Sequence, residues 1–308
     1  MKIVSGITEF QLDSRSAVAI GKFDGVHLGH RMLLDRIVRT AAADPGLKSV
    51  VFTFNPSPES LFAGQALKEL TTVSEKRLIF DRMGVDVLIE FPMNHETAAI
   101  SAGDFVEEYL VRRMHAAHVA AGSDVTFGYK GEGNADTLIS LGVKHEYSCD
   151  IIDKVTYRGE PISSTRIRNA LEAGEMETVT ALLGFPYRVT GVVSHGRHLG
   201  HSIGMPTANV ILPPDKMTGP NGVYLSRVYT VDGIHPAITN IGVKPTVMED
   251  ELLCCESFLY NFDRDIYGEY IEVELLKFVR PECRFDSIEA LKTQMQYDIE
   301  GGRTFHHL

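Results

Sequence analysis

Cysteine is scarce in this sequence, and the few cysteines are not grouped. The four among 308 residues are Cys149, Cys254, Cys255 and Cys283. They include no C-x-x-C pair and are too few to build a disulfide framework in a chain of this length. We therefore interpret them as ordinary packed thiols.

Positive charge is also in short supply. Lys and Arg total 30 against 41 Asp and Glu, which gives a formal net charge of −11. A general nucleic-acid clamp must neutralise many phosphates with a basic surface, so we expect no nucleic-acid partner. Any phosphate ligand must be held by small local sites of His, Arg, backbone N–H groups and Mg²⁺, because the field of the whole chain repels anions.

Long hydrophobic runs and an export signal are absent from the sequence. Hydrophobic residues make up 44% of it, but no stretch approaches the roughly 18 apolar residues of a membrane span. The start, MKIVSGITEF, has neither a basic region nor a continuous apolar region. We expect a cytoplasmic protein without a membrane partner, and the sequence leaves self-association open.

The length and the pattern of the first half predict an α/β domain followed by a second domain. Short β-branched runs alternate there with amphipathic stretches, as in βα units that build a parallel sheet covered by helices. Expected strands are residues 17–20, 49–54, 85–91, 118–121 and part of 144–152. Expected helices are residues 31–43, 74–83 and 101–117, the last with a capping-box pattern at its start.

The pattern changes near Gly184 and Pro186, which interrupt a helical stretch, so we predict domains of residues 1–185 and 186–308. Segments that alternate apolar with polar residues then predict a small closed sheet. These segments are residues 189–193, 223–229, 236–241 and 270–275. Asp286 and Ser287 offer an N-cap for a final helix. Its expected apolar face is Ile288, Leu291, Met295 and Ile299.

The segment GKFDGVHLGH follows the first expected strand and leads into a helix. Its glycines let the backbone approach a ligand, and His27 and His30 stand beside a helix N-terminus, where phosphate is favoured. Two imidazoles can donate hydrogen bonds to charge that builds on an α-phosphate without acting as nucleophiles. The pattern favours a polyphosphate site, although a Gly-rich turn with solvated histidines or a metal pair fits the same residues. It is not a Walker A loop.

Hydroxyl and guanidinium groups gather in a second segment, ISSTRIRNAL, at the start of another expected helix. Ser163, Ser164 and Thr165 are followed there by Arg166 and Arg168. Hydroxyls, N-terminal amides and guanidinium groups together suit a leaving pyrophosphate. Taken alone, the segment is equally an N-cap followed by surface arginines.

The second half has its own Gly-rich segment, GVVSHGRHLGHSIGMPTANV. Its glycines allow a loop whose N–H groups wrap phosphates. Thr207 and Asn209 alternate, so on an extended backbone they face one side and can offer two oxygens to Mg²⁺. Glu256 follows in an otherwise apolar run, with Phe258 on the same face if that run is extended. Such a carboxylate is either a solvated residue or a base for a hydroxyl.

GKFDGVHLGH closely resembles the signature of the adenylyltransferase half of bacterial bifunctional riboflavin kinase/FAD synthetases. ISSTRIR resembles that family's second phosphate motif, and VFTFNPSPESL and GSDVTFGYKGEGN stand between them in the expected order. The resemblance implies a Rossmann-like nucleotidyltransferase domain in which His27 and His30 contact the ATP phosphates. It implies nucleotide contacts from Gly21, Phe23, Asp24, Gly25, Ser164, Thr165 and Arg168. It implies flavin contacts from Asn55 and Asp124.

The second half resembles the riboflavin kinase domain of the same family, through GMPTAN, GPNGVY, ITNIGVKPTV, CESFLYNFDRDIYG and the tail FVRPECRFDSIEALKTQMQYDIE. The resemblance implies an antiparallel β-barrel with a terminal helix. It assigns Thr207 and Asn209 to Mg·ATP and Glu256 to deprotonating the riboflavin 5′-hydroxyl. It implies further nucleotide contacts from Gly196, Gly200 and Gly204, and flavin contacts from Arg280 and Asp298.

Together the two halves imply a bifunctional enzyme that phosphorylates riboflavin to FMN with ATP and adenylylates FMN to FAD with release of pyrophosphate. Ser57 and Thr126 stand where the family commonly has His and Arg, so the first alternative is a riboflavin kinase with a weak or silent N-terminal site. The second is a flavin-binding regulator, which would not need the full set of reacting groups. His201 and Met205 stand where the family usually has Arg and Phe.

Overall fold

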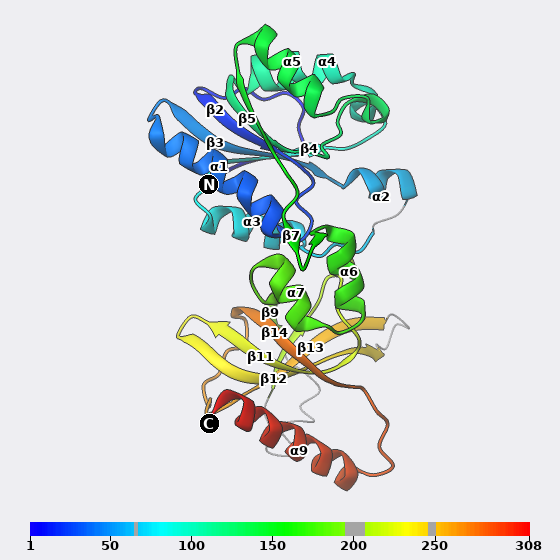
Figure 1. Ribbon diagram of the computed structural model, residues 1–308. Helices are drawn as coiled ribbons and strands as arrows, with labels where there is room; N and C mark the ends of the chain where they lie inside the picture. The colour runs from blue at the N-terminus through cyan, green and yellow to red at the C-terminus, as the bar shows by residue number, and fades with distance from the viewer. Residues whose placement is uncertain (65–66, 195–206, 246–250) are drawn as a thin grey trace. The chain divides into compact units, whose positions relative to one another are not determined.

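A computed structural model describes residues 1–64, 67–194, 207–245 and 251–308 of the chain (Figure 1). These residues divide into two compact units, Met1–Ser164 and Thr165–Leu308. Almost all of α6 (Ser164–Glu172) and the whole of α7 (Met176–Leu183) lie in the second unit, where α7 contacts two strands of a barrel. The domain limits of 1–185 and 186–308 remain a prediction.

The first unit is built on a parallel sheet of six strands, as the alternating pattern predicted. The order across the sheet is β1 (Lys2–Ser5), β4 (Val87–Pro92), β3 (Leu47–Asn55), β2 (Arg15–Ile20), β5 (Ala116–Gly122) and β6 (Ser148–Ile152). The five expected strands are confirmed. Strand β1 was not expected, because its four residues are mostly exposed and show no apolar run.

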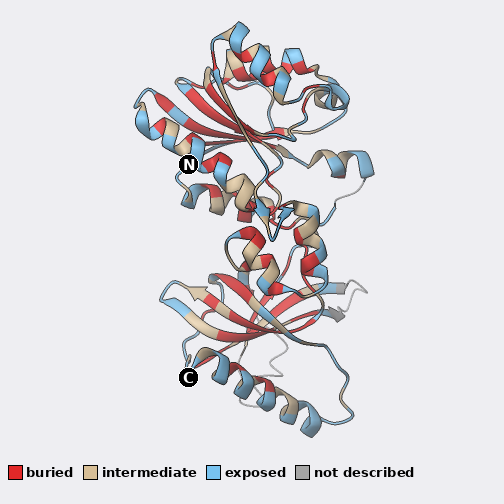
Figure 2. Ribbon diagram, in the orientation of Figure 1, coloured by how far each residue is buried: buried red, intermediate tan, exposed pale blue. Residues whose placement is uncertain are grey.

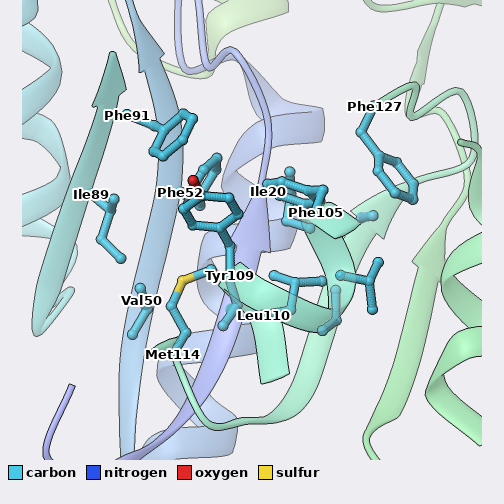
Figure 3. Close-up of a cluster of buried hydrophobic side chains, with 14 of the residues drawn as sticks. Ile20, Val50, Phe52, Ile89, Phe91, Phe105, Tyr109, Leu110, Met114 and Phe127 are labelled. Atoms are coloured by element: carbon cyan, nitrogen blue, oxygen red, sulfur yellow. The ribbon is translucent and has the colours of Figure 1, made fainter. Parts of the chain in front are cut away.

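Helices cover both faces of this sheet, and each face has its own apolar core. On one face, α1 (Leu28–Ala43) and α3 (Val73–Arg82) bury residues such as Leu34 and Phe80 against the strands. The other face is covered by the segment 102–113 and by α5 (Ala135–His145), which pack with the aromatic cluster drawn in Figure 3. Figure 2 shows the strands between these layers as the most buried part of the unit.

Short elements complete the first unit. They are α2 (Pro58–Ala63), η1 (Thr97–Ala99), η3 (Tyr129–Gly131) and the two-stranded ribbon of β7 (Thr156–Tyr157) and β8 (Glu160–Pro161).

The helix predicted over 101–117 differs from the one that forms. Ser101 does cap it, accepting a hydrogen bond from the Asp104 N–H at 3.1 Å. After α4 (Ala102–Asp104), however, the chain winds as the π-helix η2 (Phe105–Arg113), in which the Met114 N–H reaches the Tyr109 carbonyl. His115 then adopts a positive φ of 48° and β5 begins one residue later. Apolar spacing over so few turns does not separate a π-helix from an α-helix.

The second unit is a closed antiparallel barrel. Its strands run in the order β10 (Ala208–Ile211), β13 (Glu251–Leu259), β12 (Gly233–Pro245), β11 (Gly222–Thr230), β14 (Tyr270–Pro281) and β9 (Tyr187–Ser194). Inside it, the hydroxyls of Ser226, Thr239 and Ser257 form a chain with 2.7 Å between successive oxygens, and all three residues are fully buried. Residues of opposite parity on these strands therefore face outward.

The terminal helix α9 (Ile288–His306) packs on the outer face of the barrel. Ser287 caps it as expected, accepting from the Ala290 N–H at 3.1 Å. The predicted apolar face is only partly correct. Ile299 packs against an outward-facing cluster that includes Phe258, but Ile288 and Leu291 are 64% and 36% exposed. Among the described residues, Asp298, Ile299 and His306 of the second half of the helix contact the barrel.

Candidate active sites

The first site lies at the carboxyl edge of the parallel sheet, where the strand order reverses. From β2 the chain runs outward to β3 and β4, and then returns to place β5 on the opposite side of β2. In open α/β sheets ligands bind at such a switch point, because the loops after the two central strands diverge there. The loop with His27 follows β2, Asn55 ends β3 and Asp124 follows β5.

The residues of the loop between β2 and α1 make different kinds of contact. Phe23 is fully buried and its ring packs against Phe80 at 5.5 Å, so its side chain belongs to the core. The Asp24 carboxylate accepts a hydrogen bond from the Leu70 N–H at 2.8 Å. Gly21 closes the end of β2 by donating to the Phe52 carbonyl. These contacts shape the loop, and its backbone remains the part suited to a nucleotide.

His27 and His30 form a stacked pair at the start of α1. Their ring centroids are 3.8 Å apart and their planes differ by 16°. His27 is the N-cap residue, and its Nδ1 accepts from the His30 N–H at 3.4 Å. A neutral imidazole that accepts at Nδ1 carries its proton on Nε2. His27 is therefore a donor at Nε2 without being charged.

Burial keeps both rings neutral near pH 7. It lowers the pKa of His27 to about 4, although the Asp24 and Asp124 carboxylates act in the opposite direction. Burial also lowers the pKa of His30 well below its usual range, aided by His27 and Lys76. Nδ1 of His30 is buried with no hydrogen-bond partner among the described residues. A neutral imidazole still carries one N–H, so each ring can donate a hydrogen bond to developing phosphate charge.

The second phosphate motif begins α6 and spans the division between the units. Ser164 is in the first unit, where its hydroxyl donates to the Asp24 carbonyl at 3.0 Å. Thr165 and Arg168 are in the second unit. Thr165 is exposed, and Arg168 is half-buried with a nitrogen 3.4 Å from the Met217 sulfur.

The sequence singled out four residues at or just beyond the ends of β3 and β5, and all lie near the same sheet edge. Asn55 is exposed, and Asp124 is exposed and paired with Lys154 at 2.9 Å. Ser57 caps α2, because its hydroxyl accepts from the Ser60 N–H at 3.3 Å. Thr126 is exposed. The flavin contacts of Asn55 and Asp124 remain predictions.

The second site is a row of polar side chains on the outside of the barrel. Asn209 on β10 lies directly opposite Glu256 on β13, and the two share the outward face. Asn209 is buried, and its Nδ2 donates to the Thr207 hydroxyl at 3.2 Å and to the Thr207 carbonyl at 3.0 Å. The expectation that Thr207 and Asn209 face one side is confirmed. Their position beside Glu256 is a consequence of strand register.

The same row continues onto β12, where the sequence assigned no role. Asn240 lies opposite Glu256 on its other side, and its Nδ2 donates to Glu282 at 3.0 Å. Asn240 belongs to the quoted motif ITNIGVKPTV. An alternating polar residue in that strand was the available signal, but only the register relates it to Glu256.

Arg280 and Asp298 are brought together, although they come from β14 and α9. The Arg280 Nη2 is 2.5 Å from the Asp298 carboxylate, which also accepts from Gln294 at 2.9 Å. Asp298 is 7% exposed. The pair therefore fastens α9 to the barrel, and its flavin contacts remain predictions.

Five residues that the sequence analysis named lie outside the described residues. They are Gly196, Gly200, Gly204, His201 and Met205.

Mg²⁺ is the metal ion that the sequence implies, so the described residues must offer ligands for it. No group of three or more His, Cys, Asp and Glu within these ranges could hold a metal ion. The neutral oxygens of Thr207 and Asn209 do fit Mg²⁺ that arrives with ATP, because this ion takes few protein ligands and completes its shell with phosphate and water.

Known proteins match both halves of the chain. The family model for FAD synthetase matches residues 9–166, and that for riboflavin kinase matches residues 183–306. Over 300 residues the chain is 35% identical to the bifunctional riboflavin kinase/FMN adenylyltransferase of Listeria monocytogenes, covering 97% of this chain and 95% of that protein. The chain belongs to this bifunctional family. The resemblance inferred from the motifs is thereby confirmed.

One further relative agrees with this membership of the riboflavin kinase/FMN adenylyltransferase family, and one solved structure has a similar fold. The enzyme of the same description from Pseudomonas fluorescens is 35% identical over 305 residues, with 98% of this chain and 97% of that protein covered. A crystal structure described as a macrolide-efflux protein from Streptococcus pneumoniae matches with a TM-score of 0.84 and 31% identity over 98% of both chains.

In the described part of our chain, no helix combines the length and hydropathy needed to cross a membrane.

Proposed function

We propose that this chain carries out two consecutive steps of flavin cofactor synthesis. Riboflavin and ATP give FMN and ADP, and FMN with a second ATP gives FAD and pyrophosphate. Membership of the bifunctional family supports both steps over the alternative of a kinase alone. The observation that carries the proposal is the presence of two unlike polar clusters, a stacked histidine pair in one unit and the Glu256–Asn209 pair in the other.

In the adenylyl transfer, an FMN phosphate oxygen attacks the α-phosphorus of ATP and the bond to the bridging oxygen breaks, so pyrophosphate leaves. No covalent enzyme intermediate is needed, and catalysis is positioning plus stabilisation of negative charge. His27 and His30 are suited to donate hydrogen bonds to that charge, since burial leaves each ring a neutral donor. The N-terminus of α1 adds its free N–H groups.

In the kinase step, the riboflavin 5′-oxygen attacks the γ-phosphorus and ADP leaves. Glu256 is the proposed base that accepts the hydroxyl proton. It is half-buried on the outward face of β13, between Asn209 and Asn240 in register. Thr207 and Asn209 would hold Mg²⁺, which when bound neutralises charge on the transferred phosphate.

The test separates the two activities within one chain. Glu256→Gln keeps the size of the side chain and removes the base, so we expect FMN formation from riboflavin to fall at least about a hundredfold, within the range known for general bases. FAD formation from supplied FMN should continue. Chromatographic time courses started from riboflavin and from FMN measure both rates.

Glu269→Gln is the matched control, because Glu269 is also in the second unit but pairs with Arg264 at 2.5 Å. It should leave both rates unchanged. Loss of both activities together in a folded Glu256→Gln protein would contradict the division of labour. FMN that accumulates without FAD in the unmodified protein would favour the monofunctional alternative. Binding of flavin with no turnover at all would favour the regulator.

A further inference from the structure

The loop that carries His27 has a strained backbone. Phe23 and Val26 adopt positive φ angles of 53° and 44°, and both are fully buried. Such a conformation is costly for residues other than glycine, above all for a β-branched one, and persists only where surrounding contacts enforce it. Gly25 lies between them with φ of 82°. The loop therefore needs an external restraint in order to keep its shape.

Residues 70 and 71 supply that restraint from far along the chain. The Leu70 N–H donates to the Asp24 carboxylate at 2.8 Å, and the Thr71 N–H approaches the same oxygen at 3.4 Å. In return the Thr71 hydroxyl accepts from the Gly25 N–H at 3.0 Å. We call Asp24, Gly25, Leu70 and Thr71 the loop clamp. Leu70 is fully buried and Thr71 is 6% exposed, so these bonds do not compete with water.

The Thr71 hydroxyl is not needed to start the adjacent helix. The N-cap of α3 is Thr72, whose hydroxyl accepts from the Glu75 N–H at 3.3 Å, while the Glu75 carboxylate accepts from the Thr72 N–H at 2.9 Å. This reciprocal pair satisfies the helix end by itself. Two neighbouring threonines of similar burial thus have separate partners, one in the loop and one in the helix.

The clamp acts directly on the segment that leads to the histidine pair. Asp24 and Gly25 precede His27 by only a few residues, and the His27 ring both caps α1 and stacks on His30. A shift of about 1 Å in a positioning element can lower a rate a hundredfold. We propose that Thr71, acting with Asp24, is a positioning residue that holds this strained loop so that His27 and His30 meet the phosphates. The inference rests on the proposed adenylyl transfer.

Thr71→Val tests the clamp by replacing the hydroxyl with a methyl group of similar shape, which leaves the buried Gly25 N–H without its acceptor. We expect kcat for FAD formation from FMN to fall roughly tenfold to a hundredfold. Thr71→Ser retains the hydroxyl and should restore most of the rate. Thr72→Val removes the helix cap instead and is the matched control, with kcat near that of the unmodified protein. The amide NMR spectrum of each variant reports whether the first unit is folded, because Thr71 and Thr72 lie in that unit and the kinase residues do not.

A second measurement does not depend on activity. His27 is 8% exposed and burial lowers its pKa to about 4, so its ring should not titrate between pH 5.5 and 7.5 in NMR spectra. In Thr71→Val the released loop exposes the ring, and titration in this range should appear. In Thr72→Val it should stay absent.

Three results would overturn the inference. They are an unchanged kcat in Thr71→Val, an equal loss in Thr72→Val, or a His27 ring that still fails to titrate in Thr71→Val. Failure of the unmodified protein to adenylylate FMN would instead contradict the proposed function, and the NMR titration would still decide whether the clamp holds the loop.

Discussion

At the scale of single residues, burial decides the chemistry more than residue type does. A solvated histidine has a pKa near 6.5 and is partly charged at neutral pH. The His27 ring is stacked on the His30 ring, and burial lowers the pKa of His27 to about 4. The same imidazole that could serve as a cationic phosphate ligand in water is here a neutral donor. The Asp24 carboxylate has a structural role here, because it accepts hydrogen bonds from the backbone N–H groups of residues 70 and 71.

The depressed pKa of His27 predicts a pH dependence of stability. Between pH 6.5 and about 4 the unfolded chain binds a proton that the folded chain does not, so the free energy of unfolding rises with pH across this window and is level above it. The difference corresponds to about 3 kcal/mol. His27→Asn keeps an N-cap acceptor and should lose less stability on acidification. Native-state hydrogen exchange of β2 and β3 amides measures this, and parallel pH curves for the two proteins would contradict it.

At the scale of elements, local patterns predicted what depends on neighbouring residues. The expected strands of the parallel sheet formed, because buried β-branched runs are read directly from the chain. The segment 101–117 and the terminal helix were harder. The π-winding of η2 changes the hydrogen-bond partner of Met114 by one residue, and α9 packs on the outward-facing barrel cluster through Ile299, while Ile288 is mostly exposed. Neither outcome alters the apolar spacing on which the prediction rested.

The docking of α9 predicts opposite effects for two adjacent glycines. A Cβ on Gly302 would lie 2.1 Å from the Tyr260 hydroxyl, which already donates to the Ile299 carbonyl at 2.7 Å. A Cβ on Gly301 meets nothing within 4 Å. Gly302→Ala should therefore destabilise the second unit by roughly 1–3 kcal/mol. Gly301→Ala should stabilise it by about 0.5–1 kcal/mol, because alanine favours helix.

Urea unfolding followed by hydrogen exchange of barrel amides compares the two glycine variants. Equal stability of Gly301→Ala and Gly302→Ala would show that the close packing of α9 against Tyr260 does not affect the stability of the second unit. Tyr260→Phe in the Gly302→Ala background removes the oxygen that the new methyl group meets. It should recover part of the loss.

At the scale of the whole molecule, the histidine pair proposed for adenylyl transfer and the Glu256 proposed for the kinase step fall in different compact units. Neither step needs a covalent intermediate, so FMN made by one chain can serve another. We predict that a mixture of Glu256→Gln and His27→Asn proteins forms FAD from riboflavin and ATP, although each variant alone does not. Amide NMR spectra of each variant are the folding control, because the retained activity of each variant belongs to the unit that is not mutated. FMN that accumulates in the mixture without FAD would show that both sites must be intact on the same chain.

The sequence by itself determined the fold of each half and the family, because alternation of apolar residues and short motifs are local properties of a chain. It also identified His27, His30, Thr207, Asn209 and Glu256 as candidates. Which of these residues lie next to one another in the folded chain could not be predicted in this way. Glu256 faces Asn209 because two strands pair in one register, and the Thr71 hydroxyl reaches Gly25 across 46 residues. Register, burial and such long-range hydrogen bonds depend on the packed chain as a whole, so only the tertiary structure decided them.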